Sequence, residues 1–200
     1  LKDERMREHA VQIMLREQRL TNKGQWTDSH EINGRCQISW CHGAPGIAIA
    51  LFGFVGELDD TEIEQYLTRA LDETVNHPWF SSHCLCHGSM GNLEPLIMAA
   101  GHEKYAHYDS VKSEMTRESI LHIERDGFTS LLPNQTLGIG LMTGLTGVGY
   151  SLLRLHNPQE IPSILGLESP PKDLLAVSVK RGHRYGRIFC SPRTSSRRTS

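Results

Sequence analysis

Two short stretches of the sequence place cysteine, histidine and glycine in the same order. The first is Cys41-His42-Gly43, followed by Gly46, and the second is Cys86-His87-Gly88, followed by Gly91. Thiolate sulfur and imidazole nitrogen are the ligands that Zn²⁺ prefers in proteins. Because a motif that repeats within one chain indicates a repeated structural unit, this pattern concerns architecture as well as chemistry.

Cys41, Cys86 and His87 form the candidate metal site. Two thiolates and one imidazole would bind Zn²⁺ and leave a fourth position for water or substrate, as catalytic zinc sites do. The sequence has no Cys-x-x-Cys pair of the kind found in zinc fingers. A lone buried cysteine usually acts as a small hydrophobic residue, and we favour this interpretation for Cys36 and Cys84.

A pair of glycines separated by two residues precedes each of three apolar segments. The pairs begin at Gly43, Gly88 and Gly144, and the apolar segments cover residues 47–52, 93–100 and 150–155. Segments that are apolar nearly all round are typical of helices buried on most faces. The third pair has no Cys-His before it, so we interpret it as a packing feature alone.

Amphipathic helices are expected between these buried segments, and no alternating pattern predicts a strand. The first is expected within residues 3–20, with the apolar face Ala10, Val11, Met14 and Leu15. The second follows a capping box of Thr61 and Glu64 and has the apolar face Ile63, Leu67, Ala70 and Leu71. The third follows an N-cap at Asp109 or Ser110 and has the apolar face Val111, Met115, Ile120 and Leu121. Outer helix, glycine turn and buried inner helix in repetition predict an all-α fold. We expect an incomplete α/α toroid of about three repeats.

Around the two Cys-His-Gly motifs, the sequence resembles the LanC-like lanthionine cyclases. The resemblance lies in residues 39–47 and 85–88, while residues 140–150, 152–155 and 162–165 resemble the C-terminus of class II (LanM-type) lanthipeptide synthetases. It covers residues 1–171, which would form the C-terminal portion of a LanC-like cyclase domain. Residues 172–200 would form a basic, disordered tail.

The resemblance implies a zinc-dependent reaction of lanthipeptide biosynthesis. A precursor-peptide cysteine adds to dehydroalanine or dehydrobutyrine and forms a thioether ring, an activity that we expect in the context of the complete protein rather than of this chain alone. By position, Cys41, Cys86 and His87 are the zinc ligands, and Trp40 would wall the site. The acid–base Asp and His of the family lie upstream of the first zinc cysteine, so His42 is the candidate proton donor within this chain. The implied partners are a dehydrated precursor peptide and a missing upstream segment with the dehydratase and the rest of the cyclase.

Composition narrows the class of protein. The chain is 38% hydrophobic with a formal net charge of −2, which favours neither a membrane nor a nucleic-acid partner. No signal peptide is visible, and five cysteines do not suggest a disulfide framework, so we expect a cytoplasmic protein. Residues 173–200 carry seven Lys and Arg and one acidic residue. This tail could bind nucleic acid, but a disordered terminus without function is the simpler interpretation.

Two other functions remain open at this point. One is a non-catalytic zinc-binding fragment or interaction module, which would keep the ligands but lack the upstream acid–base residues. The other is a glycosidase, because α/α toroids also host such enzymes. A glycosidase needs a pair of carboxylates facing the central pocket. The candidates for that pair are Glu57, Asp59, Asp60 and Glu94.

Overall fold

The computed structural model describes residues 3–19, 26, 38–55, 61–76, 82–130 and 138–170. Within these ranges the chain forms six α-helices, one 3-10 helix and no strand. The elements are α1 (Glu4–Arg19), α2 (Ala44–Phe52), α3 (Thr61–Val75), α4 (Ser89–Ala100), η1 (Glu103–Tyr108), α5 (Asp109–Asp126) and α6 (Leu145–His156). The prediction of an all-α fold is confirmed for the part of the chain that the structure describes.

Helices α2, α4 and α6 are the inner helices of the three repeats. Each begins directly after the first glycine of a pair, so Gly43, Gly88 and Gly144 are their N-cap residues. Helix α4 packs against both α2 and α6, which makes it the middle of the series. It is also the most deeply buried, with nearly every residue from Ser89 to Ile97 inaccessible to solvent. The predicted repeat of glycine turn and inner helix is therefore present.

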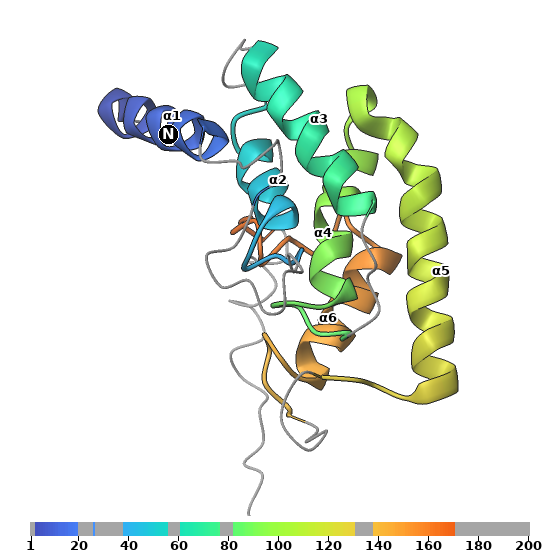
Figure 1. Cartoon of the computed structure of the whole chain (residues 1–200). Helices are drawn as coiled ribbons and strands as arrows, with labels where there is room; N and C mark the ends of the chain where they lie inside the picture. The colour runs from blue at the N-terminus through green and yellow to red at the C-terminus, as the bar shows by residue number, and fades with distance from the viewer. Residues whose placement is uncertain are drawn as a thin grey trace, which may run out of the picture. The chain divides into compact units, whose positions relative to one another are not determined.

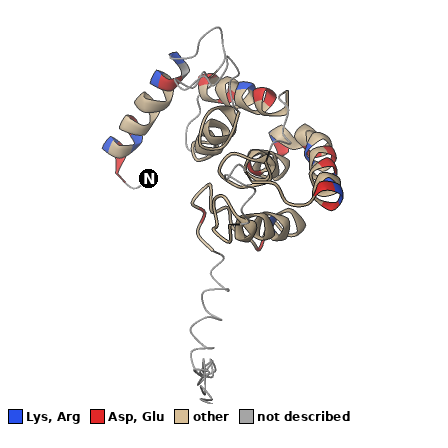
Figure 2. Ribbon diagram, turned by 60° about the horizontal axis from the view of Figure 1, so that its bottom comes forward, with Lys and Arg blue, Asp and Glu red and all other residues tan. Residues whose placement is uncertain are grey.

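Helices α3 and α5 cover this series from one side. Helix α3 packs on α2, and α5 packs on α4 (Figure 1). The charged residues gather on α1, α3 and α5, whereas the inner helices are almost free of them (Figure 2). The predicted apolar face of α3 is buried as expected: Ile63, Leu67, Ala70 and Leu71 are all inaccessible or nearly so.

Helix α5 differs from its prediction in two ways. Neither Asp109 nor Ser110 caps it, because η1 runs directly into its first turn and no side-chain cap forms. In addition, Ile120 and Leu121 are 37% and 46% exposed rather than buried. The helical period continues from Met115 to the positions four and eight residues on, so the inward side carries Ser119 and Ile123 instead.

Helix α6 was expected to be buried on most faces, and it is not. Its buried residues lie on one side, whereas Leu145, Leu152 and Leu153 are 38–58% exposed. The reason is that α4 is its main neighbour among the described helices. The sequence pattern correctly predicted an apolar helix, but whether each face of that helix is buried depends on which elements pack against it.

The chain divides into two units, Leu1–Glu168 and Ser169–Ser200. The second unit is described only at residues 169 and 170, so the predicted tail at 172–200 lies outside the described residues, as do Cys36 and the acidic residues Glu57, Asp59 and Asp60. The first unit contains the hydrophobic core, centred on α2, α3 and α4. Among the described helices, none combines the length and apolar character needed to cross a membrane.

Candidate metal centre

The loops in front of the three inner helices are joined by a series of backbone hydrogen bonds. The Cys41 amide donates to the Cys86 carbonyl at 3.2 Å, and the Cys86 amide donates to the Met142 carbonyl at 2.9 Å. These three residues occupy the same place in each repeat, two positions before the first glycine. Equivalent loops of neighbouring repeats are therefore in contact, and this contact places Cys41 and Cys86 side by side.

The second glycine of each pair is required by a carbonyl oxygen that crosses the first turn of the helix. A Cβ at Gly46 would lie 2.1 Å from the Trp40 oxygen, and a Cβ at Gly91 would lie 1.9 Å from the Leu85 oxygen. The same distance at Gly147, from the Leu141 oxygen, is 1.9 Å. Only glycine permits this approach. The packing interpretation of the third pair agrees with this geometry, and the first two pairs serve the same purpose.

Cys41, Cys86 and His87 converge at the mouth of these loops. Their ligand atoms, two sulfurs and one ring nitrogen, all lie within 4.8 Å of one another. No other group of three metal-ligating side chains is found among the described residues. Cys41 is exposed, while Cys86 and His87 are half-buried, so the cluster is open on the side of Cys41. Cys84 lies outside it, fully buried, and accepts a hydrogen bond from the Ser82 hydroxyl at 3.3 Å.

The electrostatics of this cluster suit a cation. Burial and the neighbouring Cys41 thiol raise the pKa of Cys86 to about 12, so two adjacent thiolates do not form without a compensating charge. A dication reverses this balance, because a coordinating thiol is deprotonated outright. Burial, together with the charge of His42, lowers the pKa of His87, which keeps its imidazole in the neutral form that metals bind. The donor set and its ionisation therefore fit Zn²⁺.

Two further residues lie close to the cluster. Ser39 precedes Cys41 by two residues, and its hydroxyl lies 3.5 Å from the Cys41 sulfur. His42 is exposed and near enough to His87 to lower its pKa electrostatically. Sequence analysis did not single out Ser39. Alignment of the two loops could have drawn attention to Ser39, because Ser39 and Cys84 occupy equivalent positions, two residues before Cys41 and Cys86 respectively.

A cavity of about 880 Å³ opens next to Cys41. Its walls come from α1, α2 and the segment after Pro162, and they are mostly apolar. Trp40 lines it, in agreement with the expected wall of the site, and so do Ile47 and Leu165. Glu17 and Glu168 are its charged lining residues. The metal cluster thus borders a space of the size of a short peptide segment.

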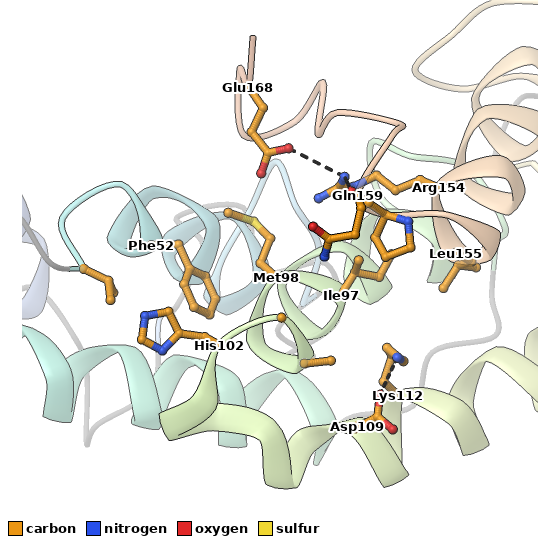
Figure 3. A pocket seen from close by; sticks show the side chains of 14 residues that line it. Phe52, Ile97, Met98, His102, Asp109, Lys112, Arg154, Leu155, Gln159 and Glu168 are labelled. Carbon is orange, nitrogen blue, oxygen red and sulfur yellow. Dashed lines mark hydrogen bonds and ion pairs between the residues drawn. The ribbon is translucent and has the colours of Figure 1, made fainter. Parts of the chain in front are cut away.

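A second cavity, of about 490 Å³, lies at the other end of the inner helices (Figure 3). Arg154 reaches it from α6 and is 3.6 Å from Glu168, while its Nε donates to Glu94 at 2.6 Å. Glu94 and Arg154 are 5% and 4% exposed. Burial raises the pKa of Glu94, and the Arg154 guanidinium opposes that effect. Held in this ion pair, Glu94 is not a carboxylate available for glycoside hydrolysis, and its proposed partners lie outside the described residues.

Comparisons with known proteins agree with this geometry. The family model described as lanthionine synthetase C-like protein matches residues 1–166. The chain is also 29% identical over 143 residues to the lacticin 481/lactococcin biosynthesis protein LcnDR2 of Lactococcus lactis subsp. lactis. That alignment covers 64% of this chain and 15% of the relative, so the chain spans a small part of the relative's length. With the family model matching most of its residues, the chain belongs to the lanthionine synthetase C-like family.

Proposed function

We propose that this chain carries the zinc centre of a lanthionine-forming cyclase, the C-terminal portion of a class II (LanM-type) lanthipeptide synthetase. The observation that supports this proposal best is the convergence of Cys41, Cys86 and His87 beside an open cavity. Three protein ligands with one open side are typical of catalytic zinc sites, whereas structural sites are closed by four.

The two thiols and the imidazole would hold the zinc ion. When bound, zinc supplies the positive charge that keeps a peptide thiol deprotonated near neutral pH. The walls of the neighbouring cavity, including Trp40 and Ile47, would orient the peptide and keep water from its reactive double bond. The proposed substrate is a precursor peptide that already contains dehydroalanine or dehydrobutyrine.

The proposed reaction is an addition within one peptide. The cysteine sulfur forms a bond to the β-carbon of the dehydro residue, and the carbon–carbon π bond breaks to give an enolate. A proton then moves to the α-carbon, and the peptide thiol has lost one proton, so the atoms balance. His42 is the proposed donor of that proton, because it is exposed and lies close to His87 at the edge of the cluster.

The proposal extends to partners and to the compartment. The peptide must be dehydrated before the addition, so we expect the reaction to depend on a dehydratase in the segment upstream of this chain. Cys41, Cys84 and Cys86 are all free cysteines. Thiol ligands persist in a reducing compartment, which for this protein we take to be the cytoplasm.

Zinc content and thiol consumption test this function together. Purified protein is analysed for zinc as wild type, Cys41→Ala and Cys86→Ala, with Cys84→Ala as the matched control from the same loop. We expect about one zinc per chain in the wild type and the control, and loss of the ion in the other two variants. A dehydrated peptide is then added, and its remaining thiol is measured by alkylation and mass spectrometry.

His42→Ala separates catalysis from metal binding. We expect it to retain zinc and to consume the peptide thiol about 10²-fold more slowly. Zinc binding without thiol consumption in the wild type would favour a non-catalytic zinc-binding fragment. A folded wild-type protein without zinc would contradict the metal assignment itself.

A further inference from the structure

The loop that carries Cys86 and His87 is anchored upstream by a histidine that the metal site does not use. His83 is fully buried, and its backbone amide donates to the Thr129 carbonyl at 3.0 Å. In return, the Thr129 amide donates to His83 Nδ1 at 3.0 Å, and the Thr129 hydroxyl lies 2.9 Å from the same nitrogen. Residues 83 and 129 are therefore joined through both main chain and side chain.

The other nitrogen of His83 continues the network to helix α5. His83 Nε2 lies 3.1 Å from His122 Nδ1, and His122 Nε2 lies 3.4 Å from an Asp126 carboxylate oxygen. Because a backbone amide can only donate, His83 Nδ1 must be an acceptor and the ring proton must sit on Nε2. His122 Nδ1 then accepts that proton's hydrogen bond, and its own proton on Nε2 faces Asp126. These contacts therefore place the ring proton of each histidine on Nε2.

The loop between this anchor and the inner helix has little room to move. The Ser89 amide, at the start of α4, donates to the Ser82 carbonyl at 2.9 Å, which closes the loop on itself. A Cβ at Gly88 would lie 2.4 Å from the Cys84 amide nitrogen, so the turn is as tight as a backbone allows. With both ends fixed, the position of the Cys86 and His87 side chains depends on the position of His83.

We propose that His83 and His122 form a positioning pair, which fixes the loop of residues 82–88 to the end of α5 and so holds Cys86 and His87 in place to bind metal. The proposal rests on the proposed metal function for its purpose, but the loop and its anchor are features of the fold itself. Residues that orient metal ligands without touching the metal commonly change metal affinity by about 10- to 100-fold when replaced.

The first test is hydrogen exchange of the full, metal-free chain, followed by mass spectrometry. Four variants are compared with the wild type: His122→Ala, His83→Ala, His83→Asn and the control Thr116→Ala. The control lies on the same helix, and its hydroxyl donates to the Lys112 carbonyl. We expect His122→Ala and His83→Ala to raise exchange in residues 82–89 by about tenfold or more, without a matching change in α3.

His83→Asn separates the two contacts of His83, because an asparagine side-chain oxygen can accept the Thr129 amide in place of Nδ1, whereas the shorter side chain has no group at the position of Nε2 to reach His122. We expect His83→Asn to raise exchange in residues 82–89 about as much as His122→Ala does, because both variants lack the contact between the two imidazoles, whereas Thr116→Ala leaves that loop unchanged. Should His83→Ala not fold, His122→Ala still decides, because the His122 side chain is 24% exposed and its loss leaves no large cavity. Wild-type exchange of residues 82–89 in His122→Ala would overturn the proposal.

The second test is titration with Co²⁺, whose absorption bands report the number of thiolate ligands and their geometry. We expect His122→Ala to bind Co²⁺ about tenfold more weakly than the wild type and to shift the bands, with the control unchanged. Equal affinity and equal spectra would overturn the positioning role. If the wild type binds no Co²⁺, the proposed metal function fails, while the exchange experiment still decides whether the pair positions the loop.

Discussion

Two glycines in helix α6 are expected to respond in opposite ways to replacement by alanine. At Gly147, a Cβ would lie 1.9 Å from the Leu141 carbonyl oxygen and 3.0 Å from Leu85 Cδ1. The near atom is backbone, so relief requires movement of the helix or of the loop before it. At Gly149, two residues on, a Cβ would meet nothing within 4 Å. The pair therefore isolates the contact from the general effect of alanine on a helix.

The magnitudes follow from these contacts. Overpacking against a rigid neighbour costs about 1–3 kcal/mol, and replacing a helical glycine by alanine returns about 1 kcal/mol. Because a Cβ at Gly147 would meet a backbone oxygen at 1.9 Å, we take the upper end of the overpacking cost and expect Gly147→Ala to lower the free energy of unfolding by about 2 kcal/mol net. Gly149→Ala should raise it by about 0.5–1 kcal/mol, because alanine restricts the unfolded chain and fits the native backbone.

Urea denaturation followed by circular dichroism measures both effects. With a dependence of about 2 kcal/mol per molar urea, the two midpoints should differ by more than about 1 M. Gly147→Ala should also weaken Co²⁺ binding, because Leu141 precedes Met142, whose carbonyl accepts the Cys86 amide. Equal midpoints for the two variants would refute the argument that the repeated glycine makes room for a carbonyl oxygen.

Three further predictions concern the ion pair, the buried histidine and the metal. Arg154→Met leaves the Glu94 carboxylate buried without its cation and should cost about 3–5 kcal/mol of unfolding free energy in urea, whereas Lys104→Met, at an exposed pair with Glu64, should leave the unfolding free energy nearly unchanged. Burial and the neighbouring His122 lower the pKa of His83. The stabilisation that neutral His83 contributes is therefore complete above about pH 6.5 and is lost as the pH falls below that value. Wild-type protein should lose more unfolding free energy than His83→Asn between about pH 7 and pH 5. Removal of zinc by a chelator should lower the unfolding free energy by about 2.7 kcal/mol from that measured at a free zinc concentration 100 times the dissociation constant, and Cys41→Ala should show no such change.

The candidate site could be located from sequence because its information is local and repeated. Cys41 and Cys86 share a motif, and equal places in neighbouring repeats lie side by side, as the hydrogen bond between these two residues shows. The glycine pairs likewise located the starts of α2, α4 and α6. A short motif sufficed in both cases, because the constraint that produces it acts within a single turn of the chain.

Other features were missed because they depend on residues far apart in the sequence. His83 and His122, like Glu94 and Arg154, belong to different helical repeats, and neither pair has a motif of its own. The exposure of Leu152 and Leu153 on α6 also escaped prediction. Hydrophobic pattern records which residues favour burial, whereas the neighbours that bury them are a property of the assembled fold.

X-ray absorption at the zinc edge identifies the atoms that bind the ion and their distances from it. For wild-type protein we expect two sulfur ligands at about 2.3 Å and one nitrogen ligand at about 2.0–2.1 Å, with a light atom in the remaining position. Cys86→Ala should lose the ion and with it the zinc spectrum, and Cys84→Ala should leave the spectrum unchanged. Three or four sulfur ligands, or a spectrum that responds to Cys84 and not to Cys86, would contradict the assignment of Cys41, Cys86 and His87.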